Sequence, residues 1–579
     1  MGQRRARRAC VGGVLLGLVV AVPACSAGET AGPPAEPTLV PTATAPATSV
    51  ELTGASTLVV NDPDAVGEVG DERLSLTEAL QLASGALGDG TLSAAERAQL
   101  DGVPGAGSGD EIRFDVDGGR IEVPEQTVPW GFEWEPAPAE TRLPRLENNT
   151  GDRIVGGGVI IANGPVDGPI GGLALKVSSS DVSVEGVTFE RFAQMVSIQP
   201  VGAGELTGVT LADNAFLNGG GIDITATAVD GSKSTVSAVT ITGNDIFGPP
   251  EFGETFPRKI HSAVGGNAAL LTASDRAGAA TIRGLSLTDN DVRGFQGGFT
   301  IAALQSRGGN ARGALDGLVI EGNTIAMPEG AGDPAVYIWG AVNMDGHVTD
   351  VTVRDVRIAE NQIAGNGYVV LVAGVEHLLQ GNTRSDSVAL DGIELEGNEI
   401  SAVETCDVGI LLAGAFTEMG GGPGEGIAVR DASITGNTAH GCTTGILATP
   451  VLNWGTAGVS KSNTIEGLEI RGNRAGGAVH EVVVAGGTLY ATDANFFDAG
   501  DAGVEQNEIR GLTIQSPSGG QGAVLVAGGL GWGPARGSVT GNAVSVTAVD
   551  VPGACTTQED VSFDSRATVT GNVLNGVGC

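Results

Sequence analysis

The chain has 579 residues, a formal net charge of −37 at pH 7, 94 glycines and only 4% aromatic residues. So negative a surface argues against binding to nucleic acid or to an anionic membrane, because those ligands are bound by clustered lysine and arginine. Few aromatic residues together with many glycines favour a chain that turns often around a narrow aliphatic core. The charge either keeps an exported protein soluble or gathers calcium on acidic loops, and both interpretations stay open.

The first 24 residues are typical of a secretory signal, with four arginines among the first eight residues and then an apolar run. Val22-Pro23-Ala24-Cys25 resembles a bacterial lipobox. We therefore expect Cys25 to become a lipidated N-terminus, with ordinary cleavage without a lipid as the alternative. Residues 25–50 are rich in Ala, Pro and Thr and are expected to form a flexible tether. These features predict an exported cell-envelope lipoprotein that contacts the membrane only through its lipid and faces the periplasm or the exterior.

Residues 51–109 are expected to form a small α/β cap. The pattern predicts a strand at Thr57–Asn61 and a helix at Leu74–Ala86, opened by Ser75 with Glu78 three residues later as a capping box. Leu74-Ser75-Leu76-Thr77-Glu78-Ala79 resembles a module found ahead of secreted bacterial β-helices and named for a Cys-Ser-Leu-Arg-Glu-Ala motif, although the Cys and the Arg are absent here. The resemblance implies architecture and no chemistry.

Two acidic clusters in the cap raise the question of calcium. Asp89 to Glu96 matches only the second half of an EF-hand loop, and a short capped helix at Ser93–Leu100 is the alternative. The other cluster contains Asn61, Asp62, Asp64, Glu68 and Asp71. A solvated turn is the preferred interpretation of that cluster, and calcium is the alternative.

Residues 110–579 repeat one unit, which is an alternating apolar segment ending in Asn, a short second segment and an aliphatic strand followed by a loop. The Asn recurs at intervals of 30 to 46 residues. It occupies Asn214, Asn244, Asn290, Asn323, Asn361, Asn398, Asn437, Asn473, Asn507, Asn542 and Asn572. Asn tolerates the left-handed backbone of a tight turn, and stacked Asn amides can bond to one another. The repeat therefore predicts a solenoid with one Asn ladder.

Residues 110–579 resemble the right-handed parallel β-helix superfamily, which includes pectate lyases, polygalacturonases, epimerases, phage tailspikes and surface proteins without known catalysis. The resemblance implies an all-β solenoid behind the α/β cap. It does not decide the function, because one fold hosts many functions.

Four cysteines follow Cys10 and Cys25, and in an exported protein they favour disulfides. Cys406 and Cys442 each lie three residues before the Gly of an aliphatic strand, so equal register in consecutive coils predicts a Cys406–Cys442 disulfide. A second disulfide, Cys555–Cys579, would then close the C-terminal coils. No CxxC motif is present, which argues against a metal centre.

The best catalytic candidates lie early in the solenoid. Asp223 alternates outward between two isoleucines, and the insertion after Asn244 contains Arg258, Lys259 and His261. A basic residue beside acidic calcium ligands could remove a proton next to a carboxylate, which is lyase chemistry. A surface loop with its own salt bridges is the alternative.

Aromatic residues in the later coils are candidates for stacking on sugar rings. They are Trp339, Trp454, Tyr490, Phe496 and Trp532. Packing of these rings on bare aliphatic strands is the alternative. The sequence thus favours a structural or surface-recognition protein of the cell envelope that binds a polysaccharide or another surface component, and a calcium-assisted polysaccharide lyase or related carbohydrate-active enzyme is the second hypothesis.

Overall fold

The structure is a computed structural model in which the described residues run from Ala55 to Gly576 with gaps. The described ranges are 55–125, 143–165, 170–228, 231–249, 262–270, 278–377, 384–417, 424–453, 458–490, 502–515, 523–532, 537–550, 555–563 and 567–576. The expected signal, Cys25 and the tether lie outside them. None of the helices within these ranges has the length and hydrophobicity needed to span a bilayer.

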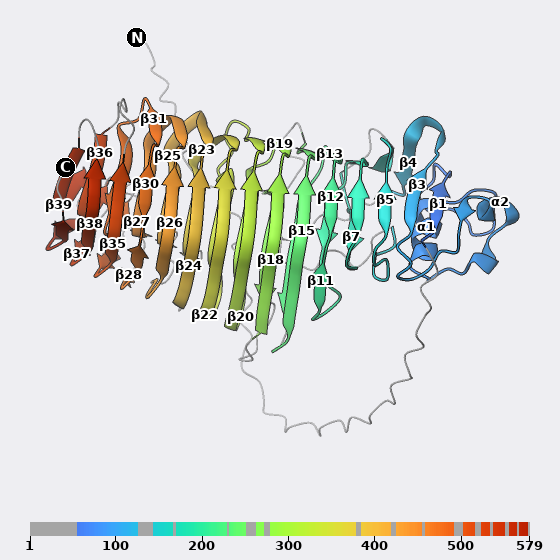
Figure 1. The fold of residues 1–579 in the computed structure, drawn as a ribbon, viewed down its shortest axis with the longest axis horizontal. Helices are drawn as coiled ribbons and strands as arrows, with labels where there is room; N and C mark the ends of the chain where they lie inside the picture. The colour runs from blue at the N-terminus through green and yellow to red at the C-terminus, as the bar shows by residue number, and fades with distance from the viewer. Residues whose placement is uncertain are drawn as a thin grey trace, which may run out of the picture.

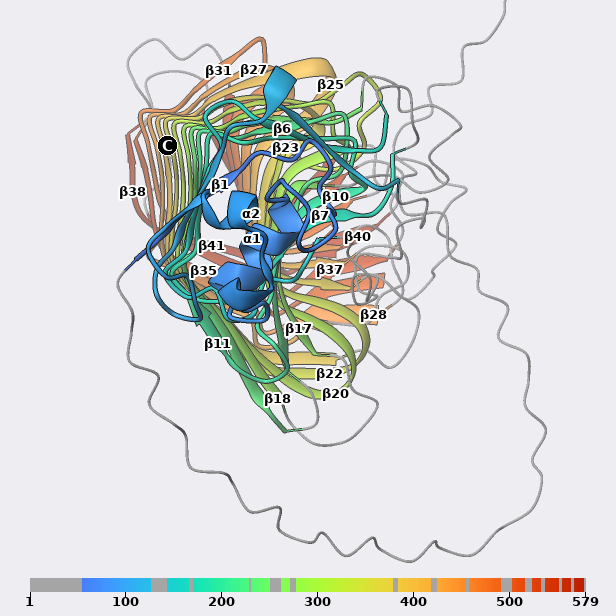
Figure 2. The same cartoon turned by 90° about the vertical axis from the view of Figure 1, so that its right-hand side faces the viewer.

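The cap occupies one end of an elongated solenoid (Figure 1). It contains β1 (Thr57–Val60), α1 (Leu76–Ala83), the 3-10 turn η1 (Asp89–Thr91), α2 (Ala94–Arg97) and β2 (Leu100–Asp101). Ser75 and Ser93 each cap a helix in a complete capping box, with Glu78 and Glu96 as the third helical residues. The predicted helix at 74–86 is therefore present but shorter. Strand β1 pairs in parallel with the first solenoid strand, so the cap covers the end of the core (Figure 2).

The strands of successive coils form three walls, A, B and C, of which wall C ends before the last coils. Wall A contains β7 (Leu173–Val177), β10 (Gln194–Ile198), β14 (Ile222–Ala228), β17 (Ser262–Leu270), the starts of β20 (Gly297–Glu321) and β22 (Val336–Ala359), the ends of β23 (Gln362–His377), β25 (Glu399–Thr417) and β27 (Thr438–Asn453), then β32 (His480–Ala485), β33 (Thr488–Tyr490), β36 (Ala523–Trp532) and β39 (Cys555–Phe563).

Walls B and C complete each turn of the chain. Wall B contains β3 (Glu111–Phe114), β5 (Arg153–Val155), β8 (Ser183–Glu185), β11 (Glu205–Thr207), β12 (Thr210–Ala212), β15 (Lys233–Thr242), β18 (Gly278–Thr288), the ends of β20 and β22, β24 (Arg384–Glu396), β26 (Ala428–Thr435), β29 (Thr464–Glu466), β30 (Glu469–Arg471), β35 (Glu508–Gln515), β38 (Ala543–Asp550) and β41 (Val573–Gly576). Wall C contains β4 (Arg120–Val123, after the 3-10 turn η2 at Asp117–Gly119), β6 (Ile160–Asn163), β9 (Thr188–Glu190), β13 (Ala215–Leu217), β16 (Asp245–Phe247), β19 (Asp291–Arg293), β21 (Thr324–Ala326), the starts of β23, β25 and β27, and β31 (Arg474–Gly476). A separate four-stranded sheet contains β28 (Gly458–Lys461), β34 (Ala502–Glu505), β37 (Ser538–Thr540) and β40 (Thr568–Thr570).

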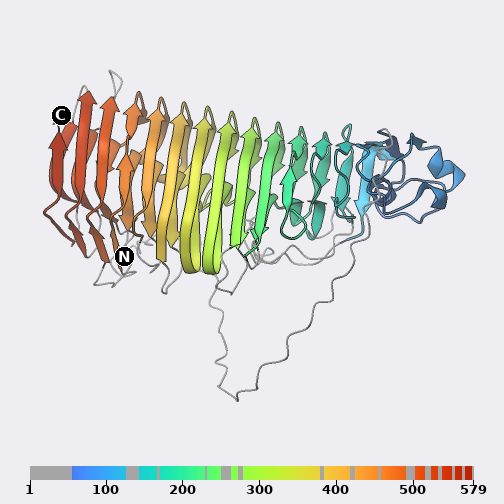
Figure 3. The same cartoon turned by 60° about the horizontal axis from the view of Figure 1, so that its bottom comes forward.

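All coil-to-coil pairings in these walls are parallel, and the strands of successive coils lie side by side along the solenoid (Figure 3). Successive side chains of a strand point to opposite faces, so every second side chain points into the solenoid core. In β14, Ile222 and Ile224 are buried in the core while Asp223 between them points outward. The predicted parallel β-helix with an α/β cap is confirmed.

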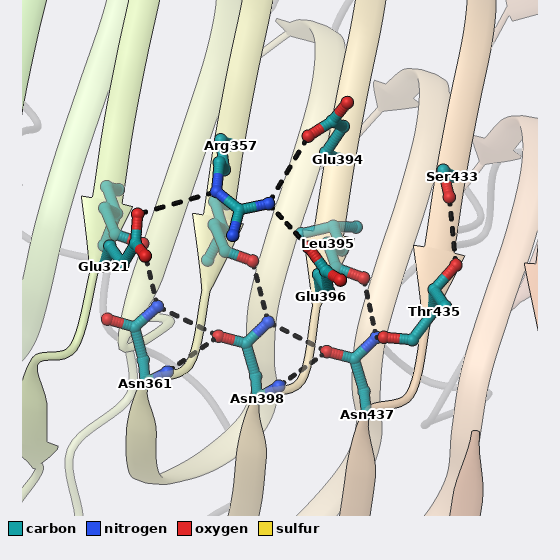
Figure 4. Close-up of polar contacts among 12 residues, drawn as sticks. Glu321, Arg357, Asn361, Glu394, Leu395, Glu396, Asn398, Ser433, Thr435 and Asn437 are labelled. Atoms are coloured by element: carbon teal, nitrogen blue, oxygen red, sulfur yellow. Dashed lines mark hydrogen bonds and ion pairs between the residues drawn. The ribbon is translucent and has the colours of Figure 1, made fainter. Parts of the chain in front are cut away.

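Buried asparagines join the coils, as a close-up of three of them shows (Figure 4). The backbone N–H and the Nδ2 of Asn361 both donate to Oδ1 of Asn398, at 3.2 and 2.9 Å. Asn398 donates to Asn437 in the same way, at 2.9 and 2.8 Å. The Nδ2 of Asn398 also donates to the carbonyl of Ile358 at 2.8 Å. Each amide is thereby satisfied inside the solenoid.

The asparagines form two ladders and not the single one that the sequence predicts. One ladder runs through Asn214, Asn244, Asn290, Asn323, Asn361, Asn398, Asn437 and Asn473. The other runs through Asn463, Asn507, Asn542 and Asn572. Strand β35, which follows Asn507, pairs with Thr464 and not with Arg474, so Asn507 stacks on Asn463 at a different corner. At the end of the second ladder the Asp560 carboxylate accepts from Asn572.

The left-handed turn residue is the one before each Asn, contrary to our expectation that the Asn itself adopts this conformation. Glu360 has φ 56° and Gly397 has φ 64° immediately before Asn361 and Asn398. The Asn side chain can then point into the solenoid while its neighbour turns the corner. This division of roles explains why Gly precedes so many of the ladder asparagines.

Oppositely charged residues alternate along the outer face of wall B. The strand register stacks Arg283, Asp316, Arg354, Asp391, Arg430, Glu466 and Arg510 in consecutive coils. Arg283 Nε lies 3.3 Å from Asp316 Oδ2. Nearby, Arg357 contacts Glu321, Glu394 and Glu396 (Figure 4). Exposed pairs of this kind contribute little each, but like charges directly opposite one another would destabilise the stack.

A disulfide joins two consecutive coils of the solenoid. Cys406 and Cys442 are bonded, with Cα atoms 4.3 Å apart and strand register that places them opposite each other. Cys555 is also disulfide-bonded, whereas Cys579 lies beyond the described ranges.

Candidate functional site

Of the four predicted catalytic residues, the structure describes only Asp223. Asp223 lies on β14, on the outer face of wall A. Arg258, Lys259 and His261 lie outside the described residues, so their convergence on Asp223 stays a prediction.

The strand register extends the column of Asp223 back toward the cap. Leu146 forms a parallel bridge with Val177, which places Arg145 beside Lys176. Lys176 is opposite Ser197 on the next strand, and Ser197 is opposite Asp223. Four consecutive coils therefore present Arg145, Lys176, Ser197 and Asp223 in one line. We call this column, with the neighbouring Gln199, Thr225 and Thr227, the outer polar face.

Lys176 is the most unusual residue of the outer polar face. It is only 9% exposed, and within the described part of the chain its ammonium forms neither an ion pair nor a hydrogen bond. Burial lowers the pKa of Lys176, and the positive charge of Arg145 lowers it further, while Asp223 and Glu147 act in the opposite direction. Arg145 itself is paired with Glu147 at 2.7 Å. A lysine whose side chain is largely buried and whose ammonium has no close partner is unfavourable, so this position suits an anionic ligand or a lysine that changes protonation.

Polar groups around Asp223 give the face its hydrogen-bonding capacity. The Thr225 hydroxyl donates to Asp223 Oδ2 at 2.8 Å, and Gln199 Nε2 donates to Thr227 Oγ1 at 3.0 Å. The next coil has Gly265 opposite Asp223, so no side chain from that position covers the carboxylate. Gln199, Asp223 and Thr225 are each partly exposed.

Sequence reasoning missed Lys176. The segment Leu173-Ala174-Leu175-Lys176-Val177 is an apolar strand with one charged residue, in a chain with only four lysines. That isolated charge was the available signal. The irregular early coils hid the register that links Lys176 to Asp223.

Farther along wall A the same outward column becomes apolar. Tyr337, Leu371, Leu411, Leu447 and Val483 succeed one another in register. The four aliphatic residues are buried in a second apolar cluster outside the solenoid core. Both faces of these strands are therefore buried, and the outward face of wall A changes from polar to apolar along its length.

Trp339 is a member of this second apolar cluster. The indole is 2% exposed and packs against Tyr337 and Phe416, with ring centroids 3.6 and 6.4 Å away. Trp339 is thus a packing residue and cannot offer its ring to a sugar, which corrects its assignment as a ligand-binding candidate. The physical reason is that its strand is apolar on both faces.

Of the other aromatic candidates, only Trp532 has a side chain that the structure describes. Trp532 is half-buried and contacts His480 and Phe563. Trp454 and Phe496 lie outside the described residues, as does the side chain of Tyr490.

No group of three or more His, Cys, Asp or Glu side chains in the described ranges is arranged to hold a metal ion. In the acidic cluster of the cap, Asn61 Oδ1 accepts from the backbone N–H of Leu74 at 2.8 Å. Asp62 Oδ1 accepts from Asp64 at 3.0 Å. These oxygens stabilise turns, but Asp62 is buried and not solvated as the solvated-turn interpretation expects.

Comparison with known proteins gives likenesses of fold. No protein-family model matches the chain, and no curated protein matches it. Among solved structures, the periplasmic alginate epimerase AlgG has 11% identity and a TM-score of 0.19, over 71% of this chain and 77% of that one. The Streptococcus pneumoniae surface protein and adhesin PfbA has 9% identity and a TM-score of 0.22, over 80% of this chain and 91% of that one. At these values nothing about activity follows, and the chain's own strand register establishes a parallel β-helix.

Proposed function

We propose that the protein is an exported cell-envelope β-helix that recognises an anionic polysaccharide on the outer polar face. The observation that supports this most directly is Lys176, a largely buried lysine beside Arg145 with no carboxylate partner among the described residues. A carboxylate or sulfate group of a glycan would supply the missing charge.

The repeat of the solenoid suits a polymer. Parallel strands lie about 4.8 Å apart, so a ligand lying along the axis meets a polar side chain at every coil. Gln199, Thr225 and Asp223 offer donors and acceptors for hydroxyl groups. The strongly negative remainder of the surface would repel anionic polymers from other sites.

Binding can be measured with the full-length protein and a panel of uronate-containing and neutral polysaccharides. We expect retention on the anionic polymers only, and at least a tenfold weaker affinity for Lys176→Ala. Lys233→Ala is the matched control, because Lys233 is exposed on wall B. Equal affinity of the two variants, or equal retention on neutral polymers, would refute the proposal.

The lowered pKa of Lys176 favours a second candidate, a polysaccharide lyase or related enzyme. A neutral lysine could remove the proton on the carbon beside a uronate carboxylate. The double bond of the unsaturated sugar would then form as the neighbouring bond to the glycosidic oxygen breaks, and that oxygen would leave with the other sugar and take up a proton. The same polymers should then develop ultraviolet absorbance from unsaturated ends, with and without calcium. Activity lost in Lys176→Ala would establish this candidate, whereas loss in Lys259→Ala alone would place the base in the insertion after Asn244. Binding without product formation leaves recognition as the function.

Export and anchoring are part of the proposal. We expect wild-type protein in the membrane fraction and Cys25→Ser in the soluble exported fraction. An unchanged distribution of Cys25→Ser would exclude a lipid on this residue.

A further inference from the structure

The two Asn ladders end in different ways. The second ladder ends on a carboxylate of the chain, because Asp560 Oδ1 accepts from the backbone N–H and the Nδ2 of Asn572, at 3.2 and 2.6 Å. The first ladder ends at Asn473, whose Oδ1 accepts from Asn437 and whose Nδ2 donates to the carbonyl of Ile434 at 2.7 Å. Within the described residues, the backbone N–H of Asn473 and the second hydrogen of its Nδ2 have no acceptor. The first ladder thus ends on two buried donors.

The sequence explains why the first ladder stops at Asn473. Arg471, two residues earlier, pairs with Gln515 on the next coil. The sequence continues from Gln515 with Ser516 and Pro517, so the repeat has a proline where the preceding coils have the ladder asparagine. A proline side chain has neither an amide donor nor a carbonyl acceptor. The acceptor for Asn473 therefore has to come from another group.

A buried carboxylate with an unused oxygen lies close to these donors. Glu481 on β32 is 2% exposed, and its Oε1 has no hydrogen-bond partner in the described part of the chain. The backbone of Ala475, two residues after Asn473, donates to the same carboxylate, and Arg474 acts on it through its charge. A buried acceptor without a donor is unfavourable. Asn473 therefore lacks an acceptor, and Glu481 nearby lacks a donor.

A small cavity joins these two residues. It has a volume of about 10 Å³ and is lined by Asn437, Asn473, Arg474 and Glu481 together with aliphatic residues. This volume is close to the smallest that can hold one water molecule. A buried water typically forms about three hydrogen bonds. The two N–H groups of Asn473 and the Oε1 of Glu481 offer that number.

We propose that this cavity binds one water molecule, which accepts from both N–H groups of Asn473 and donates to Oε1 of Glu481. In the preceding coil the same two groups of Asn437 converge on a single oxygen, Oδ1 of Asn473, at 2.9 and 3.0 Å. The ligand of Asn473 therefore has to be one atom that accepts two hydrogen bonds, and it also has to donate to a carboxylate. Water meets both requirements, whereas a metal ion cannot accept from N–H groups and an anion cannot donate to Glu481.

The bound water completes the first ladder. It does for Asn473 what the Asp560 carboxylate does for Asn572. Because Glu481 belongs to β32, the water also connects the corner of the solenoid with wall A. A glutamine at position 481 would retain a carbonyl acceptor for the water, whereas a methionine of similar length would not.

The test is a crystal structure of the full-length protein at a resolution that shows ordered water, for wild type, Glu481→Gln and Glu481→Met. Glu399→Met is the matched control, because Glu399 is an exposed carboxylate at the start of β25. We expect one water within hydrogen-bonding distance of the backbone N–H and the Nδ2 of Asn473 and of residue 481 in wild type, Glu481→Gln and Glu399→Met. Glu481→Met should lack it.

Hydrogen exchange in solution gives a second measurement that needs no crystal. Peptides from residues 470–476 report the end of the ladder, and peptides from residues 358–364 are the internal reference. Relative to this reference, exchange in Glu481→Met should be at least about fivefold faster than in wild type. Glu481→Gln and Glu399→Met should exchange like wild type.

The wild-type crystal structure decides even where Glu481→Met fails to fold. A water bonded to both Asn473 and Glu481 supports the proposal. A dry cavity overturns it, as does a metal ion at this position or a Glu481 that bonds directly to Asn473 or Arg474. Exchange of residues 470–476 that is equally fast in wild type and in folded Glu481→Met overturns it as well.

Discussion

Removal of one ladder amide, by Asn398→Ala, tests whether the asparagines hold the coils together. The substitution leaves the Asn361 backbone N–H and one N–H of its side chain without their acceptor. It also removes the donor to the carbonyl of Ile358. Three buried polar groups thus lose a partner. Because each such loss costs about 1–3 kcal/mol, we expect a destabilisation of roughly 3–9 kcal/mol.

Two measurements read out this loss. Denaturant unfolding gives the change in the free energy of unfolding, and native-state hydrogen exchange locates it, because long solenoids can open locally. The Asn361 amide should exchange much faster, while the Asn244 amide, several coils away, should be unchanged. Ser433→Ala is the control, since it removes only a half-buried hydroxyl contact at 3.0 Å on a neighbouring coil, and we expect a change within about 0.5 kcal/mol. A loss below about 1 kcal/mol with slow Asn361 exchange would show that the ladder does not stabilise the stack.

Three further predictions concern the disulfide, the end of the second ladder and a buried carboxylate. Replacement of both Cys406 and Cys442 by Ala should lower the free energy of unfolding by at most about 4 kcal/mol, as expected for a 36-residue separation, and an unchanged unfolding midpoint would contradict this. Asp560→Ala should speed exchange of the Asn572 amide while Asp560→Asn preserves it, and equal exchange in both variants would exclude an end-capping role. Burial raises the pKa of Glu481, whose Oε1 has no partner. Glu481→Gln should therefore melt above wild type at pH 8, with the difference shrinking as pH falls toward 4.5, and a pH-independent difference would refute the assignment.

Repetition made the architecture predictable. Equal residues at equal coil positions located the strands, the Cys406–Cys442 bond and most of the ladder, and local chemistry located the two capped helices. The division of the asparagines into two ladders could not be predicted, because the interval between two asparagines does not say which corner of the solenoid each one occupies. Asn463 lies only ten residues before Asn473, so the longer interval between the repeating asparagines passed over it.

The candidate site was harder to predict, because it depends on which outward face is covered. Alternation correctly turned Asp223 outward. It failed for Trp339, since an outward position on wall A is polar in early coils and buried in later ones. Lys176 was missed because register could be extended into the irregular first coils only with the strand pairing in hand.

The alternating charges of wall B restrict how such a solenoid can change its length. Deletion of the single coil that contributes Asp391 would bring Arg354 and Arg430 into direct contact, because these residues are its two neighbours in the column. Deletion of two adjacent coils would join an arginine to a carboxylate again. Duplication of one coil would likewise place two like charges side by side, whereas duplication of two adjacent coils would keep the alternation. Descendants of this chain would therefore keep a paired surface only by gaining or losing coils two at a time.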